Sequence, residues 1–164
     1  MKDSKWEVRK ATATAVGQLG ARATLALLKG LEGLIKDIDY GVREATATAI
    51  GKLGLQATPA LLKGLEGLIG DSDWGVREAT AIAIGKLGAQ ATPALKAGLQ
   101  VLTTDKEPNV SKAALTAISQ LKSAAEILGQ TSPVSAPAVS AASNNTPAPV
   151  PGTHNSALVK HWGN

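Results

Sequence analysis

Residues 74–92 read WGVREATAIAIGKLGAQAT, and closely similar stretches occur twice upstream. Residues 40–58 read YGVREATATAIGKLGLQAT and residues 6–24 read WEVRKATATAVGQLGARAT, so each copy begins 34 residues after the last. A fourth, diverged copy begins at Pro108 as PNVSKAALTAISQL. A fixed period of this length is typical of repeat proteins built from stacked supersecondary units.

Each repeat encodes two helices. The first is predicted over residues 74–87, where Asp73 is placed to cap the N-terminus and Gly88 follows at a position suited to the left-handed conformation. The second is predicted over residues 59–69, which begin with proline after the capping residue Thr58. Its leucines recur with helical spacing and form one apolar face.

A single hairpin of this kind cannot bury its apolar face, whereas stacked copies bury a continuous core. We therefore expect an all-α fold, an α-solenoid of about three and a half hairpins over residues 1–129. Residues 130–164 lack periodicity and are rich in Pro, Ser, Ala and Asn, which predicts a disordered, flexible tail. Its end at residues 156–163 is a docking motif, a cap on the solenoid, or unstructured sequence.

The composition disfavours several kinds of chemistry. Cys is absent, and both histidines, His154 and His161, lie in the predicted tail. The folded part therefore has no imidazole base to activate a nucleophile, and it has no phosphate-binding glycine loop or metal-ligand spacing. We accordingly expect a chain that is not an enzyme and needs no cofactor or metal.

Location and charge add less specific expectations. The N-terminus lacks the apolar core of a secretory signal, and no stretch of about 18 apolar residues exists, so a cytoplasmic protein without a membrane span is expected. Residues 1–36 hold seven Lys and Arg against three acids, whereas residues 37–129 hold nine against ten. The basic excess is one N-terminal patch, which makes nucleic acid an unlikely partner.

The motif D-x-D-W-G-V-R-E-A at residues 71–79, followed by a small-residue helix ending in Leu-Gly and a leucine-rich helix, resembles the HEAT repeat. The similarity is greatest to short bacterial HEAT-like repeats, which occur also in phycobilin lyase subunits. It implies a right-handed solenoid, and a ladder of Arg and Asp between neighbouring repeats. The matching positions here are Arg9, Asp37, Asp39, Arg43, Asp71, Asp73, Arg77 and Asp105. The alternative interpretation of these residues is a charged ligand site.

Glycines recur inside the second helices, where each costs up to about 1 kcal/mol relative to alanine. In HEAT-type stacks the second helices line the concave surface, so two explanations are open: a bare strip for close approach of a partner, or inheritance from recent duplication. Gly64 and Gly67 lie off the leucine face and are expected to point outward. The predicted partner-binding residues are Lys29, Gly30, Glu32, Gly33, Lys63, Gly64, Glu66, Gly67 and Gly98.

Three aromatic residues, Trp6, Tyr40 and Trp74, recur at the start of the first helices. They are expected to wedge adjacent repeats together, and the alternative is an exposed row that faces a partner.

The resulting functional hypothesis is a scaffold that binds a protein partner on the concave face. Three alternatives remain. One is a chaperone-like lyase subunit acting on a tetrapyrrole-bearing protein, which the resemblance alone suggests. Another is nucleic-acid binding by a basic face. The last is a subunit of a larger complex that self-associates through the open solenoid ends.

Overall fold

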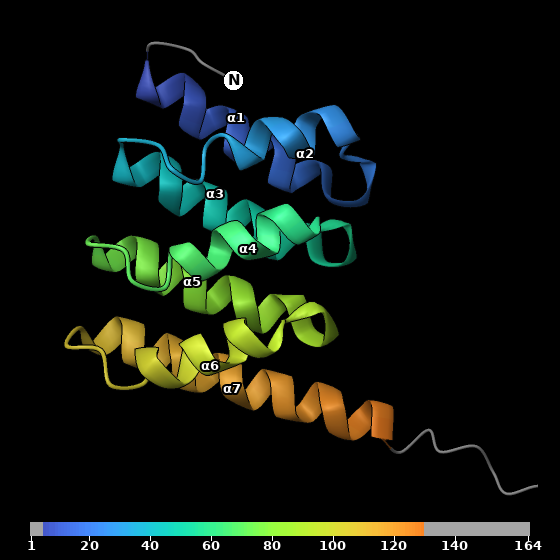
Figure 1. The fold of residues 1–164 in the computed structure, drawn as a ribbon, viewed down its shortest axis with the longest axis vertical. Coiled ribbons are helices and arrows are strands. Elements are labelled where there is room, and N and C mark those ends of the chain that lie inside the picture. The colour runs from blue at the N-terminus through green and yellow to red at the C-terminus, as the bar shows by residue number, and fades with distance from the viewer. Residues whose placement is uncertain (1–4, 130–164) are drawn as a thin grey trace, which may run out of the picture. The chain divides into compact units, whose positions relative to one another are not determined.

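The computed structural model describes residues 5–129, which form a stack of helical hairpins (Figure 1). The predicted tail at 130–164 and its motif at 156–163 lie outside the described residues. Three first helices, α1, α3 and α5, alternate with three second helices, α2, α4 and α6, and the long α7 follows as the first helix of the fourth repeat. Their bounds are Trp6–Leu19, Leu25–Glu32, Tyr40–Leu53, Pro59–Gly67, Trp74–Leu87, Pro93–Leu102 and Pro108–Gly129. The all-α solenoid expected from the repeat is thus the observed fold.

Capping residues set the helix starts that the sequence predicted, whereas α4 ends at Gly67, two residues before the predicted end. The carboxylate of Asp73 accepts from the Val76 amide at the start of α5, and Thr58 accepts from Leu61 at the start of α4. After α5 the chain turns at Gly88, whose φ of 55° is accessible to glycine at little cost. A short 3₁₀ turn then carries the chain to the second helix. The same turn follows α1 and α3.

Successive first helices approach each other very closely. A Cβ atom placed on Gly17 of α1 would lie 2.7 Å from the Ala49 Cα of α3, and one on Gly51 would lie 2.7 Å from the Ala83 Cα of α5. Only glycine leaves room for this approach, because the obstructing atoms belong to backbone that cannot rotate away. The two small residues therefore set the spacing between repeats.

The apolar core lies between the two layers of helices and continues through every repeat. Leucines of the second helices, among them Leu61, Leu65 and Leu99, are fully buried together with Ile50 and Ile84 of the first helices. The first helices also bury Thr46 and Thr80, whose hydroxyls donate to the carbonyl oxygens four residues earlier. These polar groups are satisfied within their own helices, so the core holds no unpaired hydroxyl at these positions.

None of the helices in residues 5–129 combines the length and the apolar character that crossing a bilayer requires.

The close approach predicts opposite effects for two glycine-to-alanine changes. We expect Gly51→Ala to lower the free energy of unfolding by about 1–3 kcal/mol, because its methyl group would force α3 and α5 apart. Gly67→Ala is the control: an added Cβ meets nothing within 4 Å there, so the variant should gain up to about 1 kcal/mol from better helix propensity. Urea unfolding followed by circular dichroism measures both. Equal effects of the two substitutions would contradict this account of the spacing.

Candidate functional site

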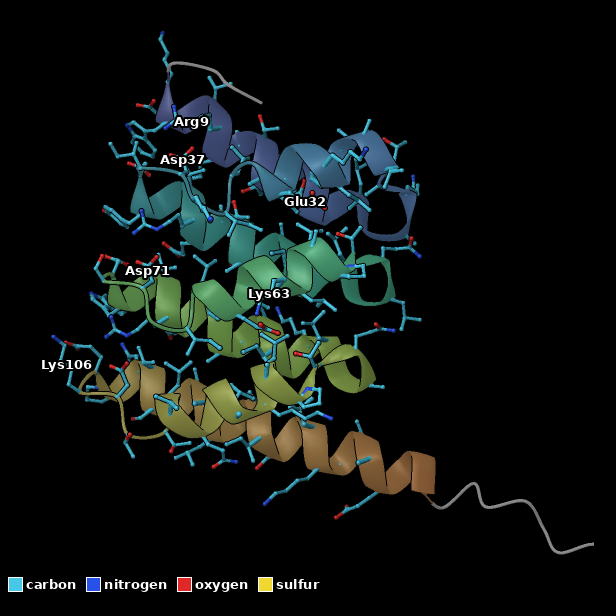
Figure 2. All side chains as sticks on the ribbon, viewed as in Figure 1. Arg9, Glu32, Asp37, Lys63, Asp71 and Lys106 are labelled. Carbon is cyan, nitrogen blue, oxygen red and sulfur yellow. The ribbon has the colours of Figure 1, made fainter. Side chains whose placement is uncertain are left out.

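Three arginines join successive repeats along one edge of the stack. Arg9 donates from Nε to Asp37 Oδ2 at 2.6 Å and from Nη2 to Oδ1 at 2.8 Å. Arg43 grips Asp71 in the same two-pronged way at 2.7 and 2.8 Å, and Arg77 grips Asp105 at 2.7 and 2.9 Å. Figure 2 shows Arg9, Asp37 and Asp71 along this edge. The paired geometry matches the planar fork of guanidinium to carboxylate and constrains orientation as well as distance.

Each interior arginine also reaches back to the loop behind it. Nη1 of Arg43 donates to the carbonyl oxygens of Asp37 and Ile38, at 2.9 and 3.1 Å, while its other nitrogens hold Asp71. Arg77 makes the same contacts with the loop at residues 71–72. One guanidinium therefore ties two consecutive inter-repeat loops together, a feature that the sequence pattern did not reveal.

Within the ladder the pKa of each aspartate is lowered, which favours its charged form. The hydrogen bonds from Arg9 hold the pKa of Asp37 below its ordinary value, and Arg77 does the same to Asp105. Burial alone would raise the pKa of Asp71, but the hydrogen bonds from Arg43 and from the Asp73 amide outweigh it and the net shift is downward. The ladder carboxylates are thus held ionised, which favours a structural role over proton transfer.

Two predicted ladder members have a different position. Asp39 and Asp73 accept hydrogen bonds from the amides of Val42 and Val76, so their carboxylates cap α3 and α5. Their own amides donate to the ladder carboxylates of Asp37 and Asp71. The resemblance placed them in the ladder by sequence position, whereas the structure places them one step outside it, as helix caps.

A second set of links joins the second helices. Thr58 donates to Glu32 Oε1 at 2.9 Å, and Thr92 donates to Glu66 Oε1 at 3.1 Å. These threonines also cap α4 and α6, so each glutamate of one repeat braces the helix start of the next. Glu66 is additionally paired with the exposed ammonium of Lys63 at 2.7 Å, which lowers the pKa of Glu66. The two glutamates were expected to face a partner; both also brace the start of the next second helix, and Glu32 in addition lines the groove described below.

The expectation that Gly64 points outward as part of a bare strip is wrong. A Cβ atom on Gly64 would lie 2.2 Å from Cδ1 of Ile35, and one on Gly98 would lie 2.1 Å from Cδ1 of Ile69. An isoleucine of the preceding repeat therefore lies over each of these glycines. Gly67 is different, because it is exposed and an added Cβ would meet nothing within 4 Å. Packing against an isoleucine thus explains the glycines at positions 64 and 98, despite their low helix propensity. Gly67, in contrast, borders open space.

A groove of about 570 Å³ lies on the second-helix face, between the end of the first repeat and α4. Its lining combines small and apolar residues with charged side chains, among them the ion pair of Arg43 and Asp71. Figure 2 shows Glu32 and Lys63 on this side of the stack. The lining residues are Glu32, Ile35, Lys36, Arg43, Ala60, Lys63, Gly64, Gly67, Leu68 and Asp71.

The groove brings together part of the predicted partner-binding set. Glu32, Lys63, Gly64 and Gly67 line it, together with four residues that the sequence analysis did not single out: Ile35, Lys36, Ala60 and Leu68. The remaining predicted residues, Lys29, Gly30, Gly33, Glu66 and Gly98, are not among its lining. Among residues 5–129, no group of acidic, His or Cys side chains has an arrangement that could hold a metal ion.

The recurring aromatic residues stand partly in solvent. Trp6, Tyr40 and Trp74 are 44%, 58% and 47% exposed, and the neighbouring Ile38 is almost fully exposed. Each ring is therefore about half buried, and both the expected wedging between repeats and the alternative of an exposed row stay predictions.

These features define a helical-repeat solenoid whose units are joined by an Arg–Asp ladder. A family model for HEAT repeats matches residues 1–66, 29–101 and 65–150, which together span most of the sequence. The chain belongs to the HEAT-repeat family.

Two solved structures illustrate the likeness. Human deoxyhypusine hydroxylase in complex with glycerol aligns at 16% sequence identity with a TM-score of 0.55, over 75% of this chain and 45% of the hydroxylase. The complex of CpcE and CpcF of phycocyanin lyase from Nostoc sp. aligns at 20% identity with a TM-score of 0.47. This alignment covers 79% of this chain and 66% of the matched chain of the lyase. The chain spans less than half of the hydroxylase. No curated protein sequence matches it.

One sequence-based prediction is corrected by these comparisons. The chain was expected not to be an enzyme, because its folded part lacks a histidine base, a phosphate-binding glycine loop and metal-ligand spacing, yet an enzyme, the human hydroxylase, shares its fold. That prediction is therefore wrong. At such low identity the likeness concerns the fold alone and assigns no reaction to this chain.

The lowered pKa values of the ladder carboxylates predict loss of stability in acid. Each ladder Asp has a lower pKa in the folded protein than in the unfolded chain, where it is about 3.9, so the native state binds fewer protons. The resulting stabilisation is complete above about pH 5 and is lost as the pH falls through 4 toward the folded pKa. Urea unfolding at a series of pH values measures this slope. Asp71→Asn should be less stable at neutral pH and should flatten the slope; an unchanged slope would show that the ladder is not its source.

Proposed function

We propose that the chain is a protein-interaction scaffold and that it binds a segment of a partner protein in the groove on its second-helix face. The observation that carries this proposal is a groove whose lining combines Ile35, Leu68 and the uncovered Gly67 with side chains of both charges. An apolar recess with a few placed polar groups is the usual form of a binding site. Glu32, Lys36 and Lys63 supply these polar groups.

The groove is stiff enough to be preformed. Arg43 and Asp71, which both line the groove, form a two-pronged ion pair with largely buried side chains, and Arg43 also holds the preceding loop. Glu32 is fixed by the hydroxyl of Thr58. A site whose walls are already held in place costs less ordering on binding, which supports recognition of a defined segment.

Three residues of the groove differ from their counterparts in the next repeat. In the next repeat Gly70, Ala97 and Val101 stand where Lys36, Lys63 and Gly67 stand here. Val101 is 67% exposed and carries a side chain where Gly67 has none. The other seven lining residues are of the same type in the next repeat, so the two repeats differ in the groove only at these three positions. Divergence confined to the two lysines and Gly67 supports a role for these residues in binding.

The proposal predicts that filling the groove removes binding without loss of fold. We expect Gly67→Trp to retain the wild-type helical content while it abolishes retention of a protein partner, because the indole would occupy the open space beside Leu68. Gly70→Trp is the matched control, since an added Cβ there is equally unobstructed but the residue does not line the groove. Affinity capture with the intact chain and both variants measures the effect. A partner retained equally by all three would place binding elsewhere.

A further inference from the structure

The contact between two repeats has a direction. Each first helix offers the next repeat a stripe at four-residue spacing, which we call the donor stripe; in α5 it consists of Arg77, Ala81 and Gly85. Arg77 holds Asp105, Ala81 is fully buried, and a Cβ on Gly85 would lie 3.0 Å from the Ala117 Cα of α7. The same stripe in α1 and α3 is Arg9, Ala13 and Gly17, and Arg43, Ala47 and Gly51.

The receiving side of each interior first helix is covered by the repeat before it. In α3 this acceptor face consists of Val42, Ala45, Ala49 and Leu53, all of which are buried. Gly17 of the preceding repeat lies against Ala49. The second helix adds two further receiving positions, Thr58, which contacts Glu32, and Gly64, over which Ile35 lies.

The first hairpin carries the same acceptor residues uncovered. Val8 is 44% exposed where Val42 and Val76 are fully buried, and Leu19 is 41% exposed where Leu53 is 3% exposed. Ala11 and Ala15 are exposed as well, although Ala45 and Ala49 are buried. Residue types are kept at these positions, so the first hairpin retains the apolar part of the acceptor face, and within residues 5–129 no helix covers it. Large exposed apolar patches of this kind usually mark an interaction site.

The opposite end of the stack has lost the matching donor stripe. At the three equivalent positions α7 has Ser111, Leu115 and Ser119 in place of Arg, Ala and Gly. Ser111 cannot form the two-pronged bond to a carboxylate, and Leu115 and Ser119 carry side chains where the interior contacts have only a methyl group or none. Leu115 is 57% exposed. A second copy of this chain therefore cannot continue the stack from head to tail with the contacts used inside it.

We infer that the acceptor face of the first hairpin, formed by Val8, Ala11, Ala15 and Leu19, docks a helical hairpin of a partner protein. The interior interfaces specify what this hairpin carries: a first helix with Arg, a small residue and Gly at four-residue spacing, then a second helix that contains Glu and is followed closely by Ile. Thr24 and Gly30 stand at the positions that receive this Glu and Ile in later repeats. This surface is separate from the groove on α4, so the inference does not depend on the proposed function.

A complementary pair of chains tests the docking. Wild-type protein offers an acceptor face and no donor stripe. A variant with Ser111→Arg, Leu115→Ala and Ser119→Gly regains the stripe, and a fourth change, Ala15→Arg, blocks its own acceptor face with a long charged side chain. We expect each protein to be monomeric alone and the mixture to form a 1:1 complex, measured by sedimentation velocity.

Two controls place the contact. Wild-type protein carrying Ala15→Arg should lose the complex with the donor variant, whereas Gly67→Trp, which alters only the groove, should keep it. Leu19→Lys serves as a second block, because Leu19 is exposed and its substitution leaves the core intact. Should the fourfold variant not fold, the milder variant Leu115→Ala, Ser119→Gly, Ala15→Arg replaces it as donor, because it restores the close helix approach alone.

Failure of folded donor and wild-type chains to associate would overturn the inference. It would also be overturned if wild-type protein alone dimerised and Ala15→Arg abolished the dimer, since two acceptor faces would then pair with each other. A complex that survives Ala15→Arg and Leu19→Lys would likewise exclude this face.

Discussion

The approach of one first helix to the next, made possible by a glycine against an alanine, is the constraint on which the rest of the structure depends. Gly17 and Gly51 bring α1, α3 and α5 so close that a single methyl group would overlap the neighbouring backbone. This spacing puts the carboxylate of Asp71 within reach of Arg43 and the hydroxyl of Thr58 within reach of Glu32. Packing of this density transmits small changes, because it has no free volume to absorb them.

The Arg–Asp ladder plays a different part from the small residues. Largely buried ion pairs add little net stability when compared with apolar packing, because desolvating both charges offsets their attraction. Their geometry is demanding, however, since both prongs of Arg43 and its contact with the Asp37 carbonyl must be satisfied together. The ladder therefore specifies the register in which one repeat meets the next, while the glycines set how near it comes.

The sequence predicted the parts of this molecule that depend on one repeat alone. Helix bounds, the caps at Thr58 and Asp73 and the turn at Gly88 follow from local rules, and the 34-residue period then implied the stack. What it could not show depends on the neighbour across an interface. Gly64 lies off the leucine face of its own helix, but Ile35 of the preceding repeat lies over it. Similarly, the half-exposed position of Trp74 and the groove beside Gly67 depend on how neighbouring repeats stack on one another.

The uneven coverage of the hairpins has a consequence for motion. In a linear stack each unit is stabilised by its neighbours alone, so cooperative opening starts where neighbours are fewest. Within residues 5–129 the first hairpin is held from one side, and its uncovered Val8 and Leu19 contribute less to its stability than their buried counterparts do in α3. The middle hairpins, covered on both sides, form the resistant part. Amide hydrogens would thus exchange along a gradient, fastest in α1 and α2 and slowest in α3 to α5. The first hairpin would therefore unfold locally more readily than the middle ones.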